Sequence, residues 1–259
     1  MIAGKIKLSD VGECRSRLDG SYHLSEAQIV KKRILSSPYP LLNLGNVTER
    51  IWHAGRWKRV YVDNPKTGIT LLGSSAMLKG DLSHEKLISK KYTDDIPDKI
   101  LQAGWILISC SGTIGNCAFT NAQHAGKLAS QDVIRLKPNN ILGAGLIYAY
   151  LASKYGYVML TQGTSGSVIQ HIEPENVEVI PIPNFPDSFK SEINQLIQDS
   201  SKLRDEAMYE LEVADKLLKE KAGLRTLTPE DYDYFGQHSA TRKPSCFARK
   251  VSEFGAVTF

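Results

Sequence analysis

The sequence predicts an α+β protein in which a mixed-sheet domain is followed by one long α-helix that packs in a coiled coil. Short apolar segments alternate with Gly, Ser, Asn and Asp clusters as far as Pro186, which is typical of strands joined by turns. From Asp187 onward, apolar residues recur every three or four positions, and the first interruption is Gly223. We therefore expect a compact domain over residues 1–186, a long helix over 187–222 and an irregular segment over 223–259.

Five segments of the first domain are expected to be β-strands: 41–47, 59–62, 105–108, 132–136 and 177–182. Residues 143–155 are expected to form a single helix, because Leu146, Ala149, Tyr150 and Ser153 would share one of its faces. The stretch 72–97 is polar and mixed in charge, so we expect it to form long surface loops.

The long helix is expected to begin at Asp187 or Ser188, either of which can cap it. At 1.5 Å per residue it would span about 54 Å. A helix of that length with one apolar stripe needs something to cover the stripe. Either the helix folds back on its own domain, or, as we favour, it forms a coiled coil with another segment or chain. The stripe consists of Ile193, Leu196, Ile197, Leu203, Ala207, Leu211, Leu217 and Leu218.

The composition is that of an ordinary globular protein. Of 259 residues, 42% are hydrophobic and 23% charged, which excludes a disordered or fibrous chain. The weakly polar run 141–152 is shorter than the ~20 residues of a membrane span, and residues 1–10 lack the apolar core of a signal peptide. The four cysteines form no CxxC pair, so we expect a reduced, cytoplasmic protein without a membrane partner. The net charge of +4 is compatible with nucleic acid.

No motif of a catalytic centre is evident. The six histidines do not fall at the spacing of zinc ligands, and Gly143-Ala144-Gly145 lacks the third glycine of a dinucleotide site. The Asp/Asn-Pro-Pro-Tyr loop of a DNA adenine methyltransferase is missing, since its nearest counterpart is Ser37-Pro38-Tyr39. Clustered carboxylates with a nearby lysine, which a metal-dependent nuclease requires, are also missing. We therefore expect a non-catalytic binding protein with no cofactor and no metal.

Three motifs occur in a characteristic order. Residues 104–115 (GWILISCSGTIG) predict a buried strand that runs into a Ser/Gly/Thr turn, and residues 129–136 (ASQDVIRL) follow. Residues 163–172 (GTSGSVIQHI) then lead to VIPIP at 179–183, just before the long helix. Over about residues 5–222 this order resembles the target recognition domain of the specificity (S) subunit of type I restriction–modification systems. It also resembles the specificity subunits of fused type II systems.

The resemblance implies a subunit that performs no chemistry itself. It would read a bipartite site in double-stranded DNA and position two kinds of partner. These are modification subunits, which methylate adenine, and restriction subunits, which translocate and cleave DNA. Its two long helices would pack antiparallel and set the distance between the half-sites. Two other classes stay open. One is a coiled-coil adaptor that binds a methyltransferase subunit without reading DNA, and the other is an enzyme that uses the turn 109–115 as an oxyanion or phosphate site.

A partial repeat also fits this family. Residues 250–255 (KVSEFG) resemble 7–12 (KLSDVG), and Arg17-Leu18-Asp19 follow the first copy. A full specificity subunit has two recognition domains, whereas this chain has one and the opening of a second. It could pair with itself as a twofold homodimer that reads a palindromic bipartite site, pair with another half, or be a remnant. The apolar stripe favours the homodimer.

Two basic clusters are the main candidates for DNA contact. Lysine and arginine bind phosphates, and an arginine can also bind guanine through two hydrogen bonds. The alternative is a solvated turn, with Trp52 or Trp57 packed in the core. The first cluster comprises Arg50, Trp52, His53, Arg56, Trp57, Lys58 and Arg59, and the second comprises Lys79, His84, Lys86, Lys90, Lys91 and Tyr92.

Two hydroxyl-bearing turns are further candidates for DNA contact. For Ser109, Ser111, Gly112 and Thr113 we favour a structural role in closing a tight turn, with Ser111 and Thr113 kept as possible DNA contacts. Gln162, Thr164 and Ser165 carry the same two interpretations. Ser130-Gln131-Asp132 is expected to stabilise the start of a core strand.

Overall fold

The structure is a computed structural model that describes residues 25–161 and 171–225. Contacts divide the chain into two units, Met1–Tyr209 and Glu210–Phe259. Both the first copy of the partial repeat and the second lie outside the described residues. Within the described residues, no helix is long and apolar enough to cross a membrane.

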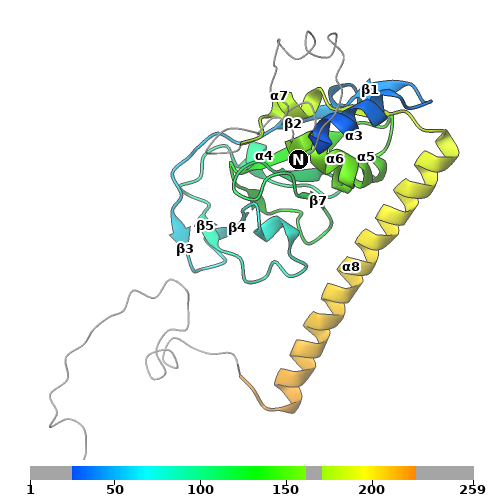
Figure 1. Cartoon of the computed structure of the whole chain (residues 1–259). Coiled ribbons are helices and arrows are strands. Elements are labelled where there is room, and N and C mark those ends of the chain that lie inside the picture. The colour runs from blue at the N-terminus through cyan, green and yellow to red at the C-terminus, as the bar shows by residue number, and fades with distance from the viewer. Residues whose placement is uncertain (1–24, 162–170, 226–259) are drawn as a thin grey trace, which may run out of the picture. The chain divides into compact units, whose positions relative to one another are not determined.

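Helices and strands are mixed along the first unit, as Figure 1 shows. The first half contains α3 (Glu26–Leu35), β1 (Leu41–Asn43), η1 (Leu44–Val47), β2 (Thr48–Trp52), β3 (Tyr61–Val62), β4 (Gly68–Leu72), η2 (Ala76–Leu78), β5 (Leu87–Ser89) and α4 (Ile96–Lys99). The second half contains β6 (Ile106–Ser109), β7 (Cys117–Phe119), β8 (Leu128–Ala129), β9 (Val133–Pro138), α5 (Ala144–Ala152), α6 (Lys154–Thr161), α7 (Pro174–Glu178) and β10 (Pro181–Pro183). The last helix, α8 (Asp187–Lys221), begins in the first unit and ends in the second.

The strands form three small sheets. The largest antiparallel sheet has the order β2-β9-β6-β7, and a second four-stranded sheet has the order β3-β5-β4-β8. In the second sheet β4 and β8 are parallel whereas the other pairs are antiparallel, so the sheet is mixed. β1 and β10 form a two-stranded antiparallel pair. The α+β class is therefore confirmed.

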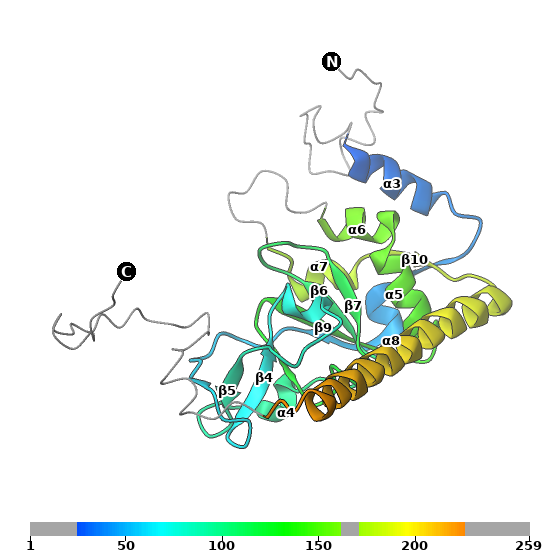
Figure 2. The ribbon, with the colours of Figure 1, turned by 90° about the horizontal axis from the view of Figure 1, so that it is seen from below.

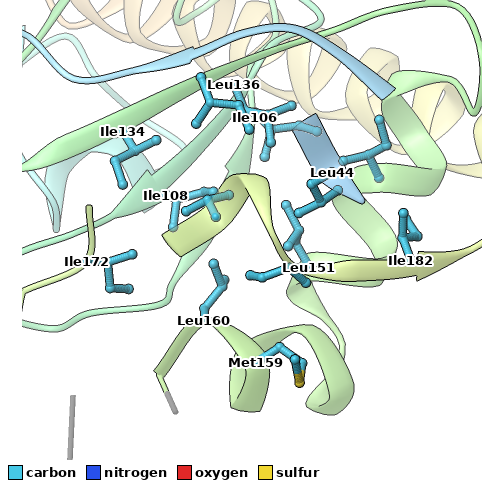
Figure 3. Packing of buried hydrophobic residues seen from close by; sticks show 14 of the residues in the cluster. Leu44, Ile106, Ile108, Ile134, Leu136, Leu151, Met159, Leu160, Ile172 and Ile182 are labelled. Carbon is cyan, nitrogen blue, oxygen red and sulfur yellow. The ribbon is translucent and has the colours of Figure 1, made fainter. Parts of the chain in front are cut away.

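Strand β6 lies between two cores, because its alternate side chains point to opposite faces of the sheet. Ile106 and Ile108 belong to one cluster, together with Leu151 of α5 and Leu160 of α6, as Figure 3 shows. Leu107 belongs to a second cluster, which contains Trp52 and Trp105. All four residues of β6 are buried. The expected strands at 105–108 and 132–136 correspond to β6 and β9, each with slightly different ends.

The long helix is confirmed as α8, within one residue of the expected end. Its apolar stripe is divided between two faces. Ile193 and Ile197 are half-buried and pack against the core of the first unit, whereas Leu196 and Leu203 are 58% and 64% exposed. Figure 2 shows the first part of α8 running beside α5. One part of the apolar stripe therefore packs on the domain, and another part is exposed.

The expectation of a single helix over 143–155 is wrong. α5 ends at Ala152, Ser153 is extended, and α6 begins at Lys154. The two helices pack closely at Gly156, where a Cβ would lie 2.2 Å from the carbonyl oxygen of Tyr150. The helical pattern on both sides of Ser153 hides this break.

The expectation of a strand over 177–182 is largely wrong. Residues Pro174–Glu178 form α7, and only Pro181–Pro183 pair as β10. Glu173 and Asn176 make a reciprocal capping box, and Pro174 occupies the first helical turn, where its missing N–H has no consequence. These local signals exceed the strand propensity of the valines and isoleucines.

The other expected boundaries also change. The expected strand 41–47 ends at Asn43 and continues as a 3-10 helix, and only Tyr61–Val62 of the segment 59–62 form a strand. The stretch 72–97 is more than surface loop. It contains η2, β5 and the start of α4, and it buries Met77, Leu82 and Ile88. Its apolar residues are too widely spaced to produce a periodic signal.

Candidate nucleic-acid interface

The first basic cluster is organised around Trp52 at the end of β2. Trp52 is buried, packs edge-on against Trp105 with ring centroids 5.2 Å apart, and donates its indole N–H to the carbonyl of Asp98 at 3.2 Å. Arg50 is exposed, and its guanidinium carbon lies 4.3 Å from the Trp52 ring centroid. Nη1 of Arg50 donates to Oδ1 of Asp98 at 2.6 Å. The ring of Trp52 and the carboxylate of Asp98 thus both hold the guanidinium of Arg50.

Local backbone features place these groups together. The pairing of β2 with β9 changes register between Thr48 and Arg50, and such an irregularity re-aims the side chains that follow it. Asp98 reaches Arg50 from α4, a one-turn helix that follows Asp95. Asp95 has φ 49°, a left-handed conformation that is uncommon for a residue other than glycine.

A surface hollow of about 500 Å³ lies between the loop after β2 and α4. Trp57 forms part of it and is half-buried, with cations of Arg59 and Lys99 at 5.6 and 5.1 Å from its ring. Its indole nitrogen is buried and makes no hydrogen bond among the described residues. Both signs of charge surround the hollow, which is lined by Arg50, Ala54, Gly55, Arg56, Trp57, Asp94, Asp95, Pro97, Asp98 and Lys99.

Two other members of the first cluster bind residues of the domain itself. Arg59 donates to the side chain of Gln131 and lies 3.5 Å from a carboxylate oxygen of Asp132. Nε2 of His53 lies 3.2 Å from a carboxylate oxygen of Glu173. Arg59 and His53, which we predicted as DNA contacts, are therefore paired with side chains of the domain itself.

Arg56 and Lys58 differ from these two residues. Both side chains are exposed, and neither forms an ion pair within the described ranges. Together with Arg50, they are the members of the first cluster that are available at the surface.

Arg135 of β9 supports this region from inside, and the sequence analysis missed it. Its side chain is fully buried and donates to four backbone carbonyls, of which the Val133 carbonyl lies at 3.0 Å and that of Lys99, the last residue of α4, at 3.5 Å. The other two acceptors are the carbonyls of Ser130 and Ala129. Burial lowers the pKa of Arg135 to about 10, although the charge of Asp98 opposes the shift. An arginine in an otherwise apolar strand (VIRL) is the only sequence signal of this role.

The second basic cluster is more exposed. Nζ of Lys79 lies 2.5 Å from Oε1 of Glu85, and that of Lys86 lies 5.6 Å from the ring centroid of Tyr61. Nζ of Lys90 reaches the carbonyl of Lys66 at 3.5 Å. His84, Lys91 and Tyr92 are also exposed.

Buried His124 anchors the backbone just before Lys79 of the second cluster. His124 donates from Nε2 to the carbonyl of Met77 at 3.1 Å. Burial lowers the pKa of His124, so the ring is kept neutral.

In the turn at 109–115, Ser109 and two glycines have structural roles. Oγ of buried Ser109 donates to the carbonyl of Thr113 and accepts from the backbone N–H of Asn116 at 3.0 Å. Gly112 and Gly115 have φ of 74° and 83°, where a side chain would be strained. The Ser109 hydroxyl is therefore used within the turn, whereas Ser111 is half-buried and Thr113 is exposed.

The remaining candidates have different outcomes. Burial raises the pKa of the Cys110 thiol to about 12, so it is not a nucleophile at neutral pH. Oγ of Ser130 accepts from the N–H of Asp132 at 3.1 Å directly before β9, as expected for the start of that strand. Gln162, Thr164 and Ser165 lie outside the described residues. In the part of the chain that the structure describes, no three metal-ligating side chains gather.

Several solved structures resemble the chain, all at low similarity. The HsdS subunit from Thermoanaerobacter tengcongensis is 16% identical with a TM-score of 0.45, and the match covers 85% of this chain and 55% of that one. The type I restriction–modification S subunit from M. genitalium is 17% identical with a TM-score of 0.44, and the match covers 85% and 57%. The type IIG restriction endonuclease BpuSI is 9% identical with a TM-score of 0.49, and the match covers 73% and 30%. The chain thus spans little more than half the length of the two S subunits.

The family assignment comes from the sequence rather than from these structures. No curated protein matches the chain. The family model for the type I restriction modification DNA specificity domain matches residues 44–199, which is more than half of the chain. The matched range runs from η1 through both basic clusters and the three ordered motifs into the first part of α8. The chain therefore belongs to the family of type I restriction modification DNA specificity domains.

Proposed function

We propose that this chain is the sequence-specific DNA recognition subunit of a type I restriction–modification complex. Residues 1–186 form the target recognition domain and read one half-site, 187–222 form the spacer and dimerisation helix, and 223–259 are a linker and the beginning of a second repeat. The subunit has no chemistry of its own. It positions modification subunits, which methylate adenine, and restriction subunits, which cleave DNA.

The observation that carries this proposal is the arrangement of Arg50 within a DNA specificity domain. An arginine reads guanine through two N–H groups, and it loses less conformational entropy on binding when its guanidinium is already held in one orientation. Trp52 and Asp98 hold Arg50 in this way, while its side chain stays 55% exposed. Arg56 and Lys58 in the same loop, and Lys79, Lys86 and Lys90 in the second cluster, are suited to phosphates, which accept any flexible cation. His53 and Arg59 position the loop through Glu173 and through Gln131 and Asp132.

Self-association would provide the second half-site. Leu196 and Leu203 on the first part of α8, and Leu211, Leu217 and Leu218 further along, are all more than half exposed. In water such an apolar stripe is stabilised by a partner helix. A twofold dimer would pair two α8 helices antiparallel and present two recognition domains to a palindromic bipartite site.

Selection from a random duplex library tests the proposal. The purified chain is tested at moderate salt with and without a DNA adenine methyltransferase subunit, and the bound duplexes are sequenced. An enriched palindrome with a fixed gap supports recognition by a dimer, and a single half-site supports recognition without the dimer. No enrichment in either condition would reject DNA recognition and favour an adaptor that binds the methyltransferase through α8.

Two variants of α8 separate dimerisation from recognition. Leu203→Asp places a charge on the exposed stripe and is expected to give a monomer in analytical ultracentrifugation with an unchanged melting temperature. Lys202→Asp, on the neighbouring exposed position, makes a larger charge change off the stripe and is expected to leave the dimer intact. A wild-type chain that is monomeric at micromolar concentration would reject the homodimer.

A further inference from the structure

The start of α5 is capped by a residue from another helix. Gly143 precedes α5 and has no side chain with which to cap it. Oδ1 of Asn194, on α8, accepts instead from the backbone N–H of Leu146 at 3.0 Å. Leu146 is the third residue of α5, which is the position whose free N–H a capping side chain normally satisfies. The two helices are therefore joined by a cap that one supplies to the other.

The same side chain uses its other end as well. Nδ2 of Asn194 donates to the carbonyl of Leu142 at 2.9 Å and to the carbonyl of Lys190, one turn earlier on α8, at 2.8 Å. Asparagine combines the acceptor and the donors that this position needs. Aspartate would set a carboxylate against two carbonyl oxygens, and alanine would leave the N–H and the Leu142 carbonyl unpaired.

Two glycines form the socket for this side chain. A Cβ on Gly143 would lie 2.4 Å from Nδ2 of Asn194, and Gly143 has φ +82°, where any side chain is strained. A Cβ on Gly145 would lie 2.9 Å from the Cα of Asn194. The Gly143-Ala144-Gly145 sequence, which is not a dinucleotide motif, thus permits the close approach of α8 to α5.

A second contact lies further along the first part of α8. The backbone N–H of Ala122 donates to Oδ2 of Asp205 at 3.3 Å. Asp205 follows Asn194 by three helical turns, or about 16 Å at 1.5 Å per residue. Between and beside these contacts, Ile193 and Ile197 pack against the core. One point of attachment would let a helix swivel, whereas two points fix its direction on the domain.

We infer that Asn194, seated in the Gly143/Gly145 socket, is the positioning residue that fixes the direction of the spacer helix on the recognition domain and so sets the gap between half-sites. The inference rests on the proposed function for its effect on DNA, but not for its effect on the helix. Asn194 reads no base. Its loss is expected to widen the range of accepted gaps and to leave the sequence of the half-site unchanged.

The test compares wild-type protein with Asn194→Ala and Asn194→Asp. The matched control is Gln195→Ala, because Gln195 is exposed and its side chain donates to Asp199 on the same helix. Nitroxide-bearing unnatural amino acids at the exposed positions Lys66 and Lys202 report the distance between domain and helix by pulsed electron paramagnetic resonance. The same four proteins are used in the duplex selection, and their affinities for a single half-site are measured.

The expected result is one narrow distance and one gap for wild type and for the control. For both Asn194 variants we expect a distance distribution at least twice as broad, a gap preference spread over neighbouring lengths, and half-site affinity within twofold of wild type. Unchanged distances and gaps would overturn the inference. So would a half-site affinity that falls in parallel with the gap preference, since that would indicate a general loss of structure. If wild type selects no DNA, the proposed function fails, and the distance measurement still decides the role of Asn194.

Discussion

The two basic clusters of this domain are similar in sequence and different in structure. In the first, Arg50 is fixed by a buried tryptophan and by the carboxylate of Asp98. In the second, Lys79 and Lys86 are exposed, Lys79 pairs with Glu85, and the Lys86 ammonium lies near the ring of Tyr61. A fixed arginine loses little conformational entropy when it binds a base edge, and flexible lysines follow a phosphate backbone without reading it. On this difference we propose that the first cluster reads bases and that the second attracts the DNA backbone.

Removing the support beneath the first cluster is expected to have the largest effect. Arg135→Met keeps a long side chain but leaves four carbonyls, including that of Lys99 in α4, without their donor. We expect the free energy of unfolding to fall by about 3 kcal/mol, because unpaired buried acceptors are costly. Urea denaturation followed by tryptophan fluorescence measures it. A loss below about 1 kcal/mol would show that Arg135 does not support the cluster.

Changing Arg50 tests whether the first cluster specifies. Arg50→Ala is expected to weaken half-site binding by about 1–3 kcal/mol and to relax the preference at one base pair. Arg50→Lys is the matched control for charge, since lysine keeps the positive charge but loses the planar guanidinium that can donate two parallel hydrogen bonds. Fluorescence anisotropy with a panel of single-base substitutions in the selected site measures both effects. Equal weakening on all sequences would place Arg50 on a phosphate and remove the distinction between the two clusters.

Changing the second cluster is expected to weaken binding without altering its specificity. Lys79→Gln, Lys86→Gln and Lys90→Gln in one protein remove three cations. Each lysine that contacts a phosphate contributes about 1 to the slope of log affinity against log salt. We expect the slope to fall by up to about 3 while the preferred sequence stays the same. Anisotropy titrations between low and moderate salt measure it, and an altered base preference would contradict the assignment.

The contrast between the clusters was only partly predictable from sequence. Both clusters, and the alternative that Trp52 is buried, follow from residue types alone. The pairing of Arg50 with Asp98 does not, because the two are separated by 48 positions and Asp98 lies on a one-turn helix without a periodic pattern. Arg135 was missed for a related reason: its place in an apolar strand is a weak signal, and the backbone carbonyls that accept from it carry no sequence signal.

The long helix was also only partly predictable from the sequence. Its length and apolar periodicity identified α8 almost to the residue. Periodicity gives the width of an apolar face and not what covers it, so Ile197, which packs on the core, and Leu203, which is exposed, were assigned to one stripe. Gly143 and Gly145 could be read only as a failed cofactor motif, because their partner Asn194 is about fifty positions away.

The smallest expected effect concerns the anchor of the second cluster, and it depends on pH. The pKa of His124 is lowered by burial, with Lys127 and Arg204 also disfavouring its charge and the Met77 carbonyl and Asp205 opposing them. The unfolded chain therefore takes up a proton near pH 6.5 that the folded chain does not. Stability contributed by neutral His124 is complete above that pH and falls as the pH drops below it. The loss ends at the lower pKa of the folded state.

His124→Gln isolates this term, because glutamine stays neutral and its amide can still donate to the Met77 carbonyl. Urea denaturation from pH 7.5 to 5 should show wild type losing stability relative to the variant as the pH falls. Amide exchange compared at equal pH should speed up at Leu78 and Lys79 in wild type and not at Trp52, since His124 bonds to the carbonyl of Met77, which directly precedes Leu78. Parallel curves for the two proteins would show that protonation of His124 does not loosen the second cluster, and the two clusters would then differ in charge geometry alone.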